Sequence, residues 1–371
     1  MQAQKYNILL LIDSLLAGGA EKVLLTLSRE FFKRGHTVTL LNLSSKVALE
    51  IPEEINVINC NFAHAKPRKA AKYVKDFLKL YHSLENSYGA FDFVLGNLPL
   101  AESFIHVSKI KGCFLIHCIL SHHIVSNKKS RFRIFKKKLC YKNLFKGRQL
   151  IFCSNYARED AGEFFSLPKE NCTTIYNPID IGLIKKKALE TKPKDLPSNP
   201  YIIHVGSFTK VKRHDKLIHA YKHSGISAEL VLIGVGPEES AIRKLVATLG
   251  LENKVHFLGL KNNPFVYMRH AQLFISSSDS EALPTVIIEA LICETFVVAT
   301  KTLGAIEILK DYMSDSLCEI GNTIQLGALI RKFYFNEMKI DYSKIYNRFS
   351  ADKIALEYET FIDSMKDLER N

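Results

Sequence analysis

The stretch of residues 272–300 limits the fold of this chain more than any other. It begins with a short apolar strand at 272–276 and a polar turn, after which Pro284 occupies the first turn of an expected helix, where proline is best tolerated. Apolar residues at helical spacing follow, and a second apolar strand ends the stretch at 296–300. This order of strand, turn, helix and strand predicts an α/β fold.

The same alternation of strands and helices runs along the whole chain. Residues 6–13 predict a strand that is apolar on both faces, as in parallel sheets, and a paired-glycine loop then leads into a helix at 20–34. A length of 371 residues suits two domains of ordinary size. The Lys-rich segment 181–200 contains three prolines, which predicts a linker between the domains.

Two carboxylates of the stretch have a spacing that suits a particular ligand. Glu281 lies just before the expected helix, and Glu289 lies inside it, ~12 Å away if the residues between them are helical. The helix N-terminus between them can bind phosphate, because its N–H groups are unpaired and carry a partial positive charge. The arrangement suits a nucleotide-sugar, in which a diphosphate joins two sugars. An ordinary solvated glutamate is the plain alternative for either residue taken alone.

The wording of this stretch also resembles a family signature. Ser278-x-x-Glu281-Ala282-Leu283-Pro284, then Glu289-Ala290 and Val297-Val298, is similar to the E-x7-E region of the GT4-type retaining glycosyltransferases (glycosyl transferases group 1), which have the GT-B fold. The chain departs from the family pattern at Ala282 and Glu294, where the family has glycine, and at Phe296, where it has proline. Alanine at position 282 is strained only if that backbone needs a positive φ.

The resemblance extends over nearly the whole chain. It includes Gly18-Gly19-Ala20-Glu21-Lys22 near the start, Gly206-Ser207 with Lys212-Arg213 after the strand at 201–205, Gly234-Val235-Gly236-Pro237, and Leu258-Gly259. It implies two Rossmann-like, doubly wound domains that face each other across a cleft. The acceptor- and membrane-facing domain would span 1–180 and the nucleotide-sugar-binding domain 201–345, and a terminal helix at 346–371 would cross back to the first domain.

The resemblance further implies roles for single residues. Glu281 would hold the donor sugar, Lys212 would grip the diphosphate, and Glu289 would hold the ribose. Ser207 stands where the family has arginine, and Arg213 or Lys210 is a candidate to compensate. The expected catalytic residues are Glu281, Lys212 and His117, the expected donor-binding residues are Gly19, Gly206, Ser207, Arg213, Leu258, Leu283, Pro284, Thr285 and Glu289, and Gly18 is expected on the acceptor side.

His117 ends the strand expected at 113–117. Open α/β sheets bind ligands at the carboxyl ends of their strands, and in the family a histidine at this place contacts the donor sugar or supports the reacting centre. His122 and His123 are close rivals for that role. A hydrogen-bonded surface histidine without a catalytic role is the plain alternative.

Residues 128–148 form the most basic stretch of the chain, with ten Lys or Arg and no acid. Aromatic and aliphatic residues interleave at near-helical spacing, which is the composition of a helix that lies in a membrane interface with its cations towards lipid phosphates. A basic helix packed on its own sheet and a nucleic-acid groove are the alternatives. The residues expected to dock on an anionic membrane are Lys128, Lys129, Arg131, Phe132, Arg133, Phe135, Lys136, Lys137 and Lys138.

Composition limits the location and the cofactors. A net charge of +13 favours an acidic partner, and eight cysteines without a CxxC pair indicate reduced thiols in a cytosol. Neither a signal peptide nor a stretch long enough to cross a bilayer is evident. We expect a cytoplasmic protein, peripheral on the inner face of the cytoplasmic membrane, with no nucleic-acid partner. The absence of Asp-x-Asp argues against the metal-dependent GT-A type, so no obligatory metal and no cofactor beyond the nucleotide-sugar co-substrate are expected.

The resemblance implies a retaining, metal-independent hexosyltransferase-type glycosyltransferase that acts in bacterial lipopolysaccharide, O-antigen or capsule synthesis. It would move a sugar from a nucleotide-sugar, expected to be UDP-linked with GDP and ADP left open, to a saccharide or lipid-linked acceptor. The acceptor hydroxyl would attack on the face from which the nucleotide leaves. Two alternatives stay open: a GT-B nucleotide-sugar epimerase, and a non-catalytic membrane-bound partner of the same fold, which Ser207 and Ala282 would support.

Overall fold

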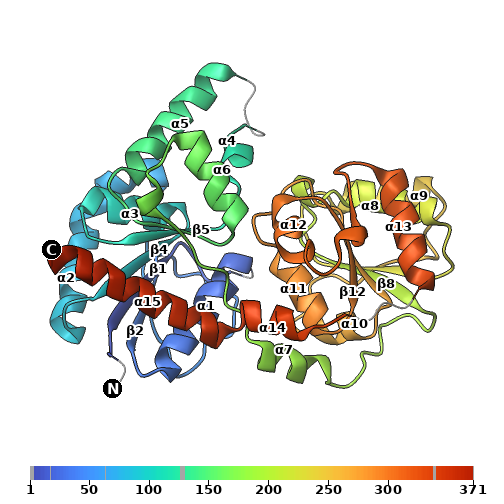
Figure 1. Cartoon of the computed structure of the whole chain (residues 1–371), viewed down its shortest axis with the longest axis horizontal. Helices are drawn as coiled ribbons and strands as arrows, with labels where there is room; N and C mark the ends of the chain where they lie inside the picture. The colour runs from blue at the N-terminus through green and yellow to red at the C-terminus, as the bar shows by residue number, and fades with distance from the viewer. Residues whose placement is uncertain (1–3, 17, 63, 126–129, 337–339, 371) are drawn as a thin grey trace. The chain divides into compact units, whose positions relative to one another are not determined.

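The computed structural model describes residues 4–16, 18–62, 64–125, 130–336 and 340–370, and the chain divides into two compact units. The N-terminal unit contains Met1–Ile179 together with Phe349–Asn371, and the C-terminal unit contains Asp180–Arg348. Each unit is an α/β domain built round one parallel sheet, with helices on both faces (Figure 1). The expected fold of two Rossmann-like domains is confirmed.

The sheet of the N-terminal unit has seven strands among the residues described, in the order β3-β2-β1-β4-β5-β6-β7. Every pair of neighbours is parallel. The strands are β1 Asn7–Ile12, β2 Thr37–Asn42, β3 Asn56–Asn59, β4 Phe93–Asn97, β5 Cys113–Ile116, β6 Leu150–Phe152 and β7 Cys172–Thr174.

Helices connect these strands and return at the end of the chain. They are α1 Gly19–Lys33, η1 Pro67–Tyr73, α2 Val74–Tyr88, α3 Pro99–Ser108, α4 Leu120–Val125, α5 Arg131–Phe145, α6 Asn155–Phe165, η2 Lys169–Asn171 and α15 Ala351–Arg370. Helix α1 ends at Lys33, close to the end expected at residue 34, and Gly35 just beyond it has a φ of +87°, which favours glycine. The 3-10 turn η1 leads directly into α2.

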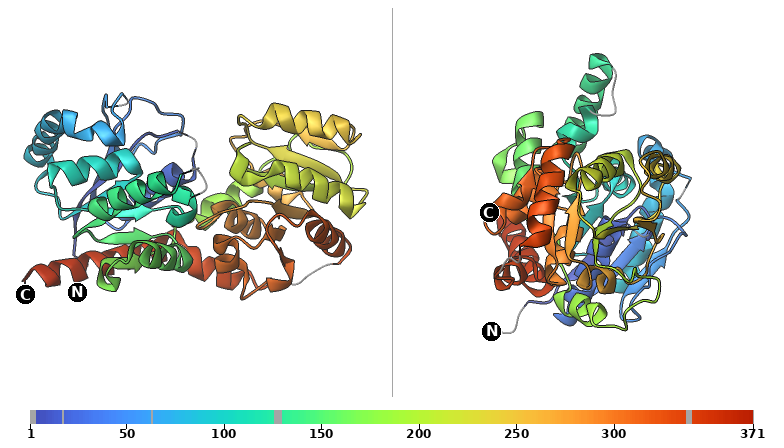
Figure 2. Two further views of the ribbon diagram at one scale, coloured as in Figure 1. Left: turned by 90° about the horizontal axis from the view of Figure 1, so that it is seen from above. Right: turned by 90° about the vertical axis from the view of Figure 1, so that its right-hand side faces the viewer.

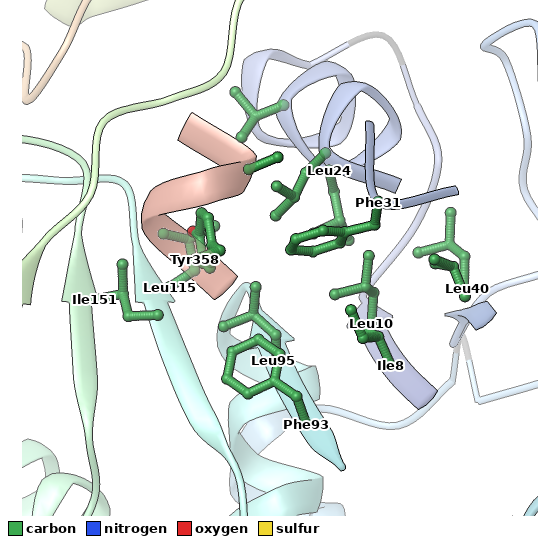
Figure 3. Close-up of a cluster of buried hydrophobic side chains, with 14 of the residues drawn as sticks. Ile8, Leu10, Leu24, Phe31, Leu40, Phe93, Leu95, Leu115, Ile151 and Tyr358 are labelled. Carbon is green, nitrogen blue, oxygen red and sulfur yellow. The ribbon is translucent and has the colours of Figure 1, made fainter. Parts of the chain in front are cut away.

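The main core of the N-terminal unit lies between its sheet and helices α1 and α15 (Figure 3). Tyr358 of α15 is 1% exposed and packs edge-to-face against Phe31 of α1, with ring centroids 5.9 Å apart. Leu10 of β1 and Leu95 of β4 face the same cluster. The terminal helix is therefore part of the core of the first unit, as the family resemblance implies.

The sheet of the C-terminal unit has six parallel strands among the residues described, in the order β10-β9-β8-β11-β12-β13. The strands are β8 Tyr201–Val205, β9 Glu229–Ile233, β10 Val255–Phe257, β11 Leu273–Ser276, β12 Phe296–Thr300 and β13 Leu317–Cys318. The helices are α7 Ile181–Ala188, η3 Lys210–Lys212, α8 His214–Ser224, α9 Glu239–Thr248, α10 Phe265–Arg269, α11 Thr285–Ile292, α12 Leu303–Leu309, η4 Ser314–Ser316, α13 Thr323–Phe335 and α14 Ser343–Phe349.

The segment expected to be a linker at 181–200 differs from that expectation. Residues 181–188 form α7, which packs against α10 and α11 of the C-terminal unit. Asp180 caps this helix by accepting a hydrogen bond from the Leu183 N–H at 2.9 Å, and Ile184 is buried. Three lysines in its last turn are favourable beside the negative end of the helix dipole. The basic composition therefore belongs to a helix rather than to a flexible connection.

The long helix expected near the end of the chain is broken at Ser350. There the Ile179 N–H donates to Phe349 O at 2.9 Å, and the Ala351 N–H donates to Ile179 O at 3.0 Å. This short extended bridge satisfies backbone groups that a continuous helix would pair internally. Within the described ranges, no helix combines the length and apolar character needed to cross a bilayer.

Candidate active site

A loop at the carboxyl end of β8 leads from Gly206 to Arg213 and into α8. The loop after β9 packs against its backbone at very short range. A Cβ on Gly234 would lie 2.1 Å from Gly206 O, and a Cβ on Gly236 would lie 2.5 Å from Phe208 O. Only glycine permits this approach, so the Gly-x-Gly phrase supports the shape of the first loop.

A second loop, between β11 and α11, is tied to the first by hydrogen bonds. Ser277 Oγ donates to Lys212 O at 2.9 Å, and the Asp279 N–H donates to Val211 O at 2.8 Å. Its far end is held by the Gly304 N–H, which donates to Glu281 O at 2.9 Å. The two segments, residues 206–213 and 276–285, are called the donor loops below.

The donor loops bring two of the expected catalytic residues together. Lys212 Nζ lies 2.5 Å from Glu281 Oε1, and their side chains are 21% and 16% exposed. Ser278 Oγ donates to the same carboxylate oxygen at 2.7 Å. A cation and an anion are therefore held at one place, beside the N-terminus of α11, where phosphate and sugar hydroxyls can both be bound.

Arg213 crosslinks the donor loops. Its guanidinium donates to Asp215 at 2.9 Å and to Asp279 at 2.8 Å, and these hydrogen bonds raise its pKa. Its backbone has a φ of +51°, a conformation that costs a non-glycine residue free energy. The guanidinium of Arg213 already donates to Asp215 and Asp279, so the expectation that it contacts the donor stays a prediction.

Two buried histidines that the sequence motifs do not indicate lie under the first donor loop. The His204 Nδ1 donates to Ile275 O at 2.7 Å, and His214 stacks on Phe208 with ring centroids 4.1 Å apart. Burial lowers the pKa of His204 to about 4 and that of His214 to about 2, so both rings are neutral. A histidine inside the apolar strand 201–205 was the available signal.

The other expected donor residues lie at the edges of these loops. Leu283 and Pro284 are buried in the turn that leads into α11, and Thr285 begins that helix. Glu289 is half-buried on α11, Leu258 is half-buried just after β10, and Ser207 is exposed. Ala282 is absent from the residues with positive φ in the described chain, so alanine is unstrained there.

The expected residues of the N-terminal unit follow β1 and β5. Gly18 precedes α1, and a Cβ there would lie 2.1 Å from a carboxylate oxygen of Glu21, whereas a Cβ on Gly19 would meet nothing within 4 Å. His117 directly follows β5. Its Nε2 is buried with no hydrogen-bond partner among the described residues, and burial lowers its pKa to about 4. The neutral ring can therefore donate a hydrogen bond to a ligand or accept one from it.

Helix α5 carries the described part of the expected membrane surface and extends away from the sheet of its unit (Figures 1 and 2). Lys128 and Lys129 lie outside the described residues. Phe132, Phe135 and Leu139 are 73%, 65% and 58% exposed and follow one another at helical spacing. At its other end Tyr141 and Phe145 pack on Phe165 of α6. The helix thus rests on its own unit and leaves an apolar stripe uncovered.

Among the described residues, no group of three or more His, Cys, Asp or Glu side chains is placed to hold a metal ion.

Two family models match this chain, one for each half. The model described as Glycosyltransferase Family 4 matches residues 17–183, and the model described as Glycosyl transferases group 1 matches residues 186–351.

Similar proteins and structures cover almost the whole chain. The N-acetylgalactosamine-N,N'-diacetylbacillosaminyl-diphospho-undecaprenol 4-alpha-N-acetylgalactosaminyltransferase of Campylobacter jejuni is 30% identical over 368 residues, which are 94% of this chain and 97% of that protein. The crystal structure of HepE from Anabaena with UDP and glucose has a TM-score of 0.76 at 19% identity and covers 97% of this chain and 100% of its own. WaaG, a glycosyltransferase involved in lipopolysaccharide biosynthesis, has a TM-score of 0.68 at 17% identity over 95% of both chains.

Proposed function

This chain belongs to the group 1 glycosyltransferases of the GT4 type, and from that premise we propose that it transfers a sugar, with retention, from a UDP-sugar to a lipid-diphosphate-linked saccharide. The glycosyltransferase activity itself and a role in surface glycan synthesis follow from its relatives. The donor, the stereochemistry, the acceptor and the independence from metal are the proposed parts.

The ion pair between Lys212 and Glu281 is the observation that carries the proposal. A diphosphate leaving group develops negative charge, and without a metal ion fixed cations must stabilise that charge. Lys212 supplies one such cation, and the N-terminal amides of α11 point their partial positive charge to the same turn. Ser278 and Lys212 both contact Oε1 of Glu281, and we propose that the hydroxyls of the donor sugar donate to the other carboxylate oxygen.

The proposed reaction exchanges one bond at the anomeric carbon for another. The bond from that carbon to the diphosphate oxygen breaks, and the bond to the acceptor oxygen forms on the same face of the sugar. The acceptor proton passes to the departing diphosphate, so no protein carboxylate has to act as a base. The neutral ring of His117 is proposed to accept or donate a hydrogen bond to the donor sugar.

The acceptor and the membrane enter the proposal through α5 and through one relative. The name of the Campylobacter relative specifies a diphospho-undecaprenol acceptor, which a bilayer would hold. Burying a phenylalanine contributes roughly 1.5–3 kcal/mol, and each nearby Lys or Arg adds about 1 kcal/mol at an anionic surface. The exposed stripe of Phe132, Phe135 and Leu139, flanked by cations, is therefore proposed to dock on anionic lipid.

A transfer assay tests this function. Purified protein is incubated with UDP-, GDP- or ADP-sugars and a short-chain prenyl-diphosphate-linked N-acetylgalactosamine, with and without EDTA. We expect a longer saccharide from a UDP-sugar, with the same anomeric configuration as the donor by NMR, and no loss with EDTA.

Other results would replace parts of the proposal. Inversion of configuration would contradict the front-face mechanism, and activity lost to EDTA would contradict metal independence. Interconversion of the UDP-sugar without any acceptor would identify an epimerase. A ligand that binds only the folded state must stabilise it. If none of the nucleotide-sugars raises the melting temperature, the protein would be a non-catalytic partner.

A further inference from the structure

A pocket of about 960 Å³ lies within the N-terminal unit, between α3 and α5. This volume is at the upper end of the roughly 300–1,000 Å³ typical of small-molecule sites. Pro99 and Val107 of α3 and Phe132 and Leu144 of α5 give it apolar walls. Pro99, the first residue of α3, follows closely after β4 and lines the pocket, so this end of the pocket lies near the carboxyl edge of the sheet, at which α/β folds bind ligands.

Glu102 is the unusual member of this lining. The residue is only 4% exposed, it lines the pocket, and no hydrogen bond from any described residue reaches its carboxyl group. Asp13 lies close enough to repel its charge, but both Asp13 oxygens accept from the first amides of α3, at Leu100 and Ala101. Burial, with this neighbouring charge, raises the pKa of Glu102 to about 8. At neutral pH it is therefore a carboxylic acid with one donor and one acceptor.

Cationic side chains line the same pocket. Arg68 comes from η1, and Arg133, Lys136 and Lys137 come from α5. A ligand that complements these walls combines an anionic group, some apolar surface and a neutral polar group for the buried acid. An N-acetylated saccharide attached to a lipid diphosphate has all three features.

We propose that the pocket between α3 and α5 receives the saccharide of the acceptor, and that Glu102 selects it by hydrogen-bonding an amide or hydroxyl group as a carboxylic acid. This inference rests on the proposed function and deepens it. A protonated carboxyl matches an acetamido group in particular, because it can donate to the amide oxygen and accept from the amide N–H. Leaving such a buried group unpaired costs free energy, so a sugar without that partner is disfavoured.

Deprotonation of Glu102 would remove its donor and place a second negative charge beside Asp13. Other groups face this acid from every element packed around it. They are Cys118 after β5, Tyr141 with Arg133, Lys136 and Lys137 on α5, His106 on α3, His123 on α4 and Arg68 on η1. Glutamine keeps a donor and an acceptor at all pH values, and leucine of similar volume keeps neither.

The experiment compares Glu102→Gln and Glu102→Leu with wild type. The probes are short-chain prenyl-diphosphate-linked N-acetylgalactosamine and its galactose analogue, with UDP-N-acetylgalactosamine as donor. We expect the Leu variant to raise the acceptor KM roughly tenfold, the value of one hydrogen bond, with the donor KM unchanged. The Gln variant should stay near wild type at pH 7 and keep its KM above pH 8, where that of wild type rises. Glu163→Gln, an exposed carboxylate on α6, is the matched control.

Stability separates binding from structure. If Glu102 serves acceptor binding, the Leu variant should melt at the wild-type temperature or above, since it removes a buried unpaired acid. The inference would be overturned if the Leu variant had a lower melting temperature and an unchanged acceptor KM. It would also be overturned if wild type and the Leu variant each used the N-acetylgalactosamine probe and the galactose probe equally well. If wild type transfers nothing, the proposed function fails on its own. Calorimetric titration with the acceptor probe alone then tests whether the pocket binds the acceptor. Weaker binding by the Leu variant than by wild type would support the inference, and equal binding by both, or no binding, would refute it.

Discussion

Charged side chains have protein partners in the donor loops of the C-terminal unit. On the surface formed by α3 and α5 in the N-terminal unit, several of them have none among the described residues. In the donor loops, Lys212 pairs with Glu281, and Arg213 pairs with two aspartates. On the α3–α5 surface, Glu102 has no hydrogen bond from a described residue, and Arg131, Arg133 and Lys136 form no ion pair within the described chain.

This difference separates two ways of preparing a site. The donor loops are preorganised, so little ordering has to accompany binding of a small charged ligand. The α3–α5 surface keeps an uncompensated acid, neighbouring cations and an exposed apolar stripe. Such a surface is costly in isolation, and under the proposed function an acceptor ligand and a lipid surface would supply the missing partners. We infer that the two halves of the reaction, donor activation and acceptor capture, are built on these different principles.

Removing the central ion pair should have the largest effect. Lys212→Ala and Glu281→Ala should each lower kcat/KM for transfer by roughly 10²–10³-fold, the size seen when one preorganised stabilising group is lost. Melting temperature and circular dichroism should stay near those of wild type, because the pair is partly exposed. Lys222→Ala, on the exposed side of α8, is the control. Wild-type activity in either variant would end the assignment of these residues to the site.

Removing the exposed stripe should weaken membrane docking. Phe132→Ser together with Phe135→Ser should lower binding to vesicles of phosphatidylglycerol and phosphatidylcholine at least tenfold, from the area term of roughly 1.5–3 kcal/mol per phenylalanine. Wild-type binding should also fall as salt rises, since exposed charges are screened. Phe335→Ser is a matched control, because Phe335 and Phe135 are both 65% exposed. Equal loss in the control, or binding indifferent to lipid charge, would contradict a specific surface.

Removing a charge from a preorganised ionic cluster in the N-terminal unit should have an effect of intermediate size, on stability. Glu359 of α15 accepts from Arg34 at 2.6 Å and contacts His36 at 2.7 Å, and these partners lower its pKa. Glu359→Gln should destabilise the unit by roughly 1.5–3 kcal/mol, the range for hydrogen bonds to charged groups. A depressed carboxyl pKa stabilises the fold above the pKa of unfolded glutamate, about 4.3, and the effect disappears as pH falls through the folded value. Urea denaturation at pH 7 and pH 3 checks this, with Glu357→Gln as control. A difference that did not shrink between pH 7 and pH 3 would contradict the ionic cause.

Two positions where the family has glycine should show the smallest effects, in opposite directions. Glu294 has a φ of +60°, whereas Ala282 is unstrained. Glu294→Gly should therefore raise stability by roughly 0.5–1 kcal/mol, with little loss from its exposed ion pair to Arg269. Ala282→Gly should leave stability unchanged or lower it. Thermal melting of both variants measures the contrast, and stabilisation by Ala282→Gly would show that this turn is strained after all.

The sequence supported the fold and the donor loops better than the α3–α5 surface, for physical reasons. Strand and helix periods are local, so the order of elements followed from them, and the spacing of Glu281 and Glu289 lay within one turn-helix unit. The contact between Lys212 and Glu281 joins residues 69 positions apart, and only the sheet order brings them together. The family resemblance indicated both residues without indicating their ion pair.

Two features could not be predicted because they depend on packing between distant elements. Glu102 stands on α3 next to Ala101 and near Phe104, but whether it is buried depends on α5. Residues 181–188 have the composition of a linker, yet packing against α10 and α11 turns them into a helix. The strain at Glu294 and its absence at Ala282 likewise depend on backbone angles that residue identity alone does not give.

The contribution of α15 to the first core also orders events during synthesis on the ribosome. Residues 1–179 leave the ribosome before the C-terminal unit, but Tyr358 and its neighbours on α15, which close their core, emerge after it. The C-terminal unit is continuous in sequence and can complete its own sheet before α15 emerges. The apolar faces of α1 and β1 in the nascent N-terminal unit therefore stay uncovered until α15 emerges, and such exposed apolar surface makes a partly folded chain prone to aggregate.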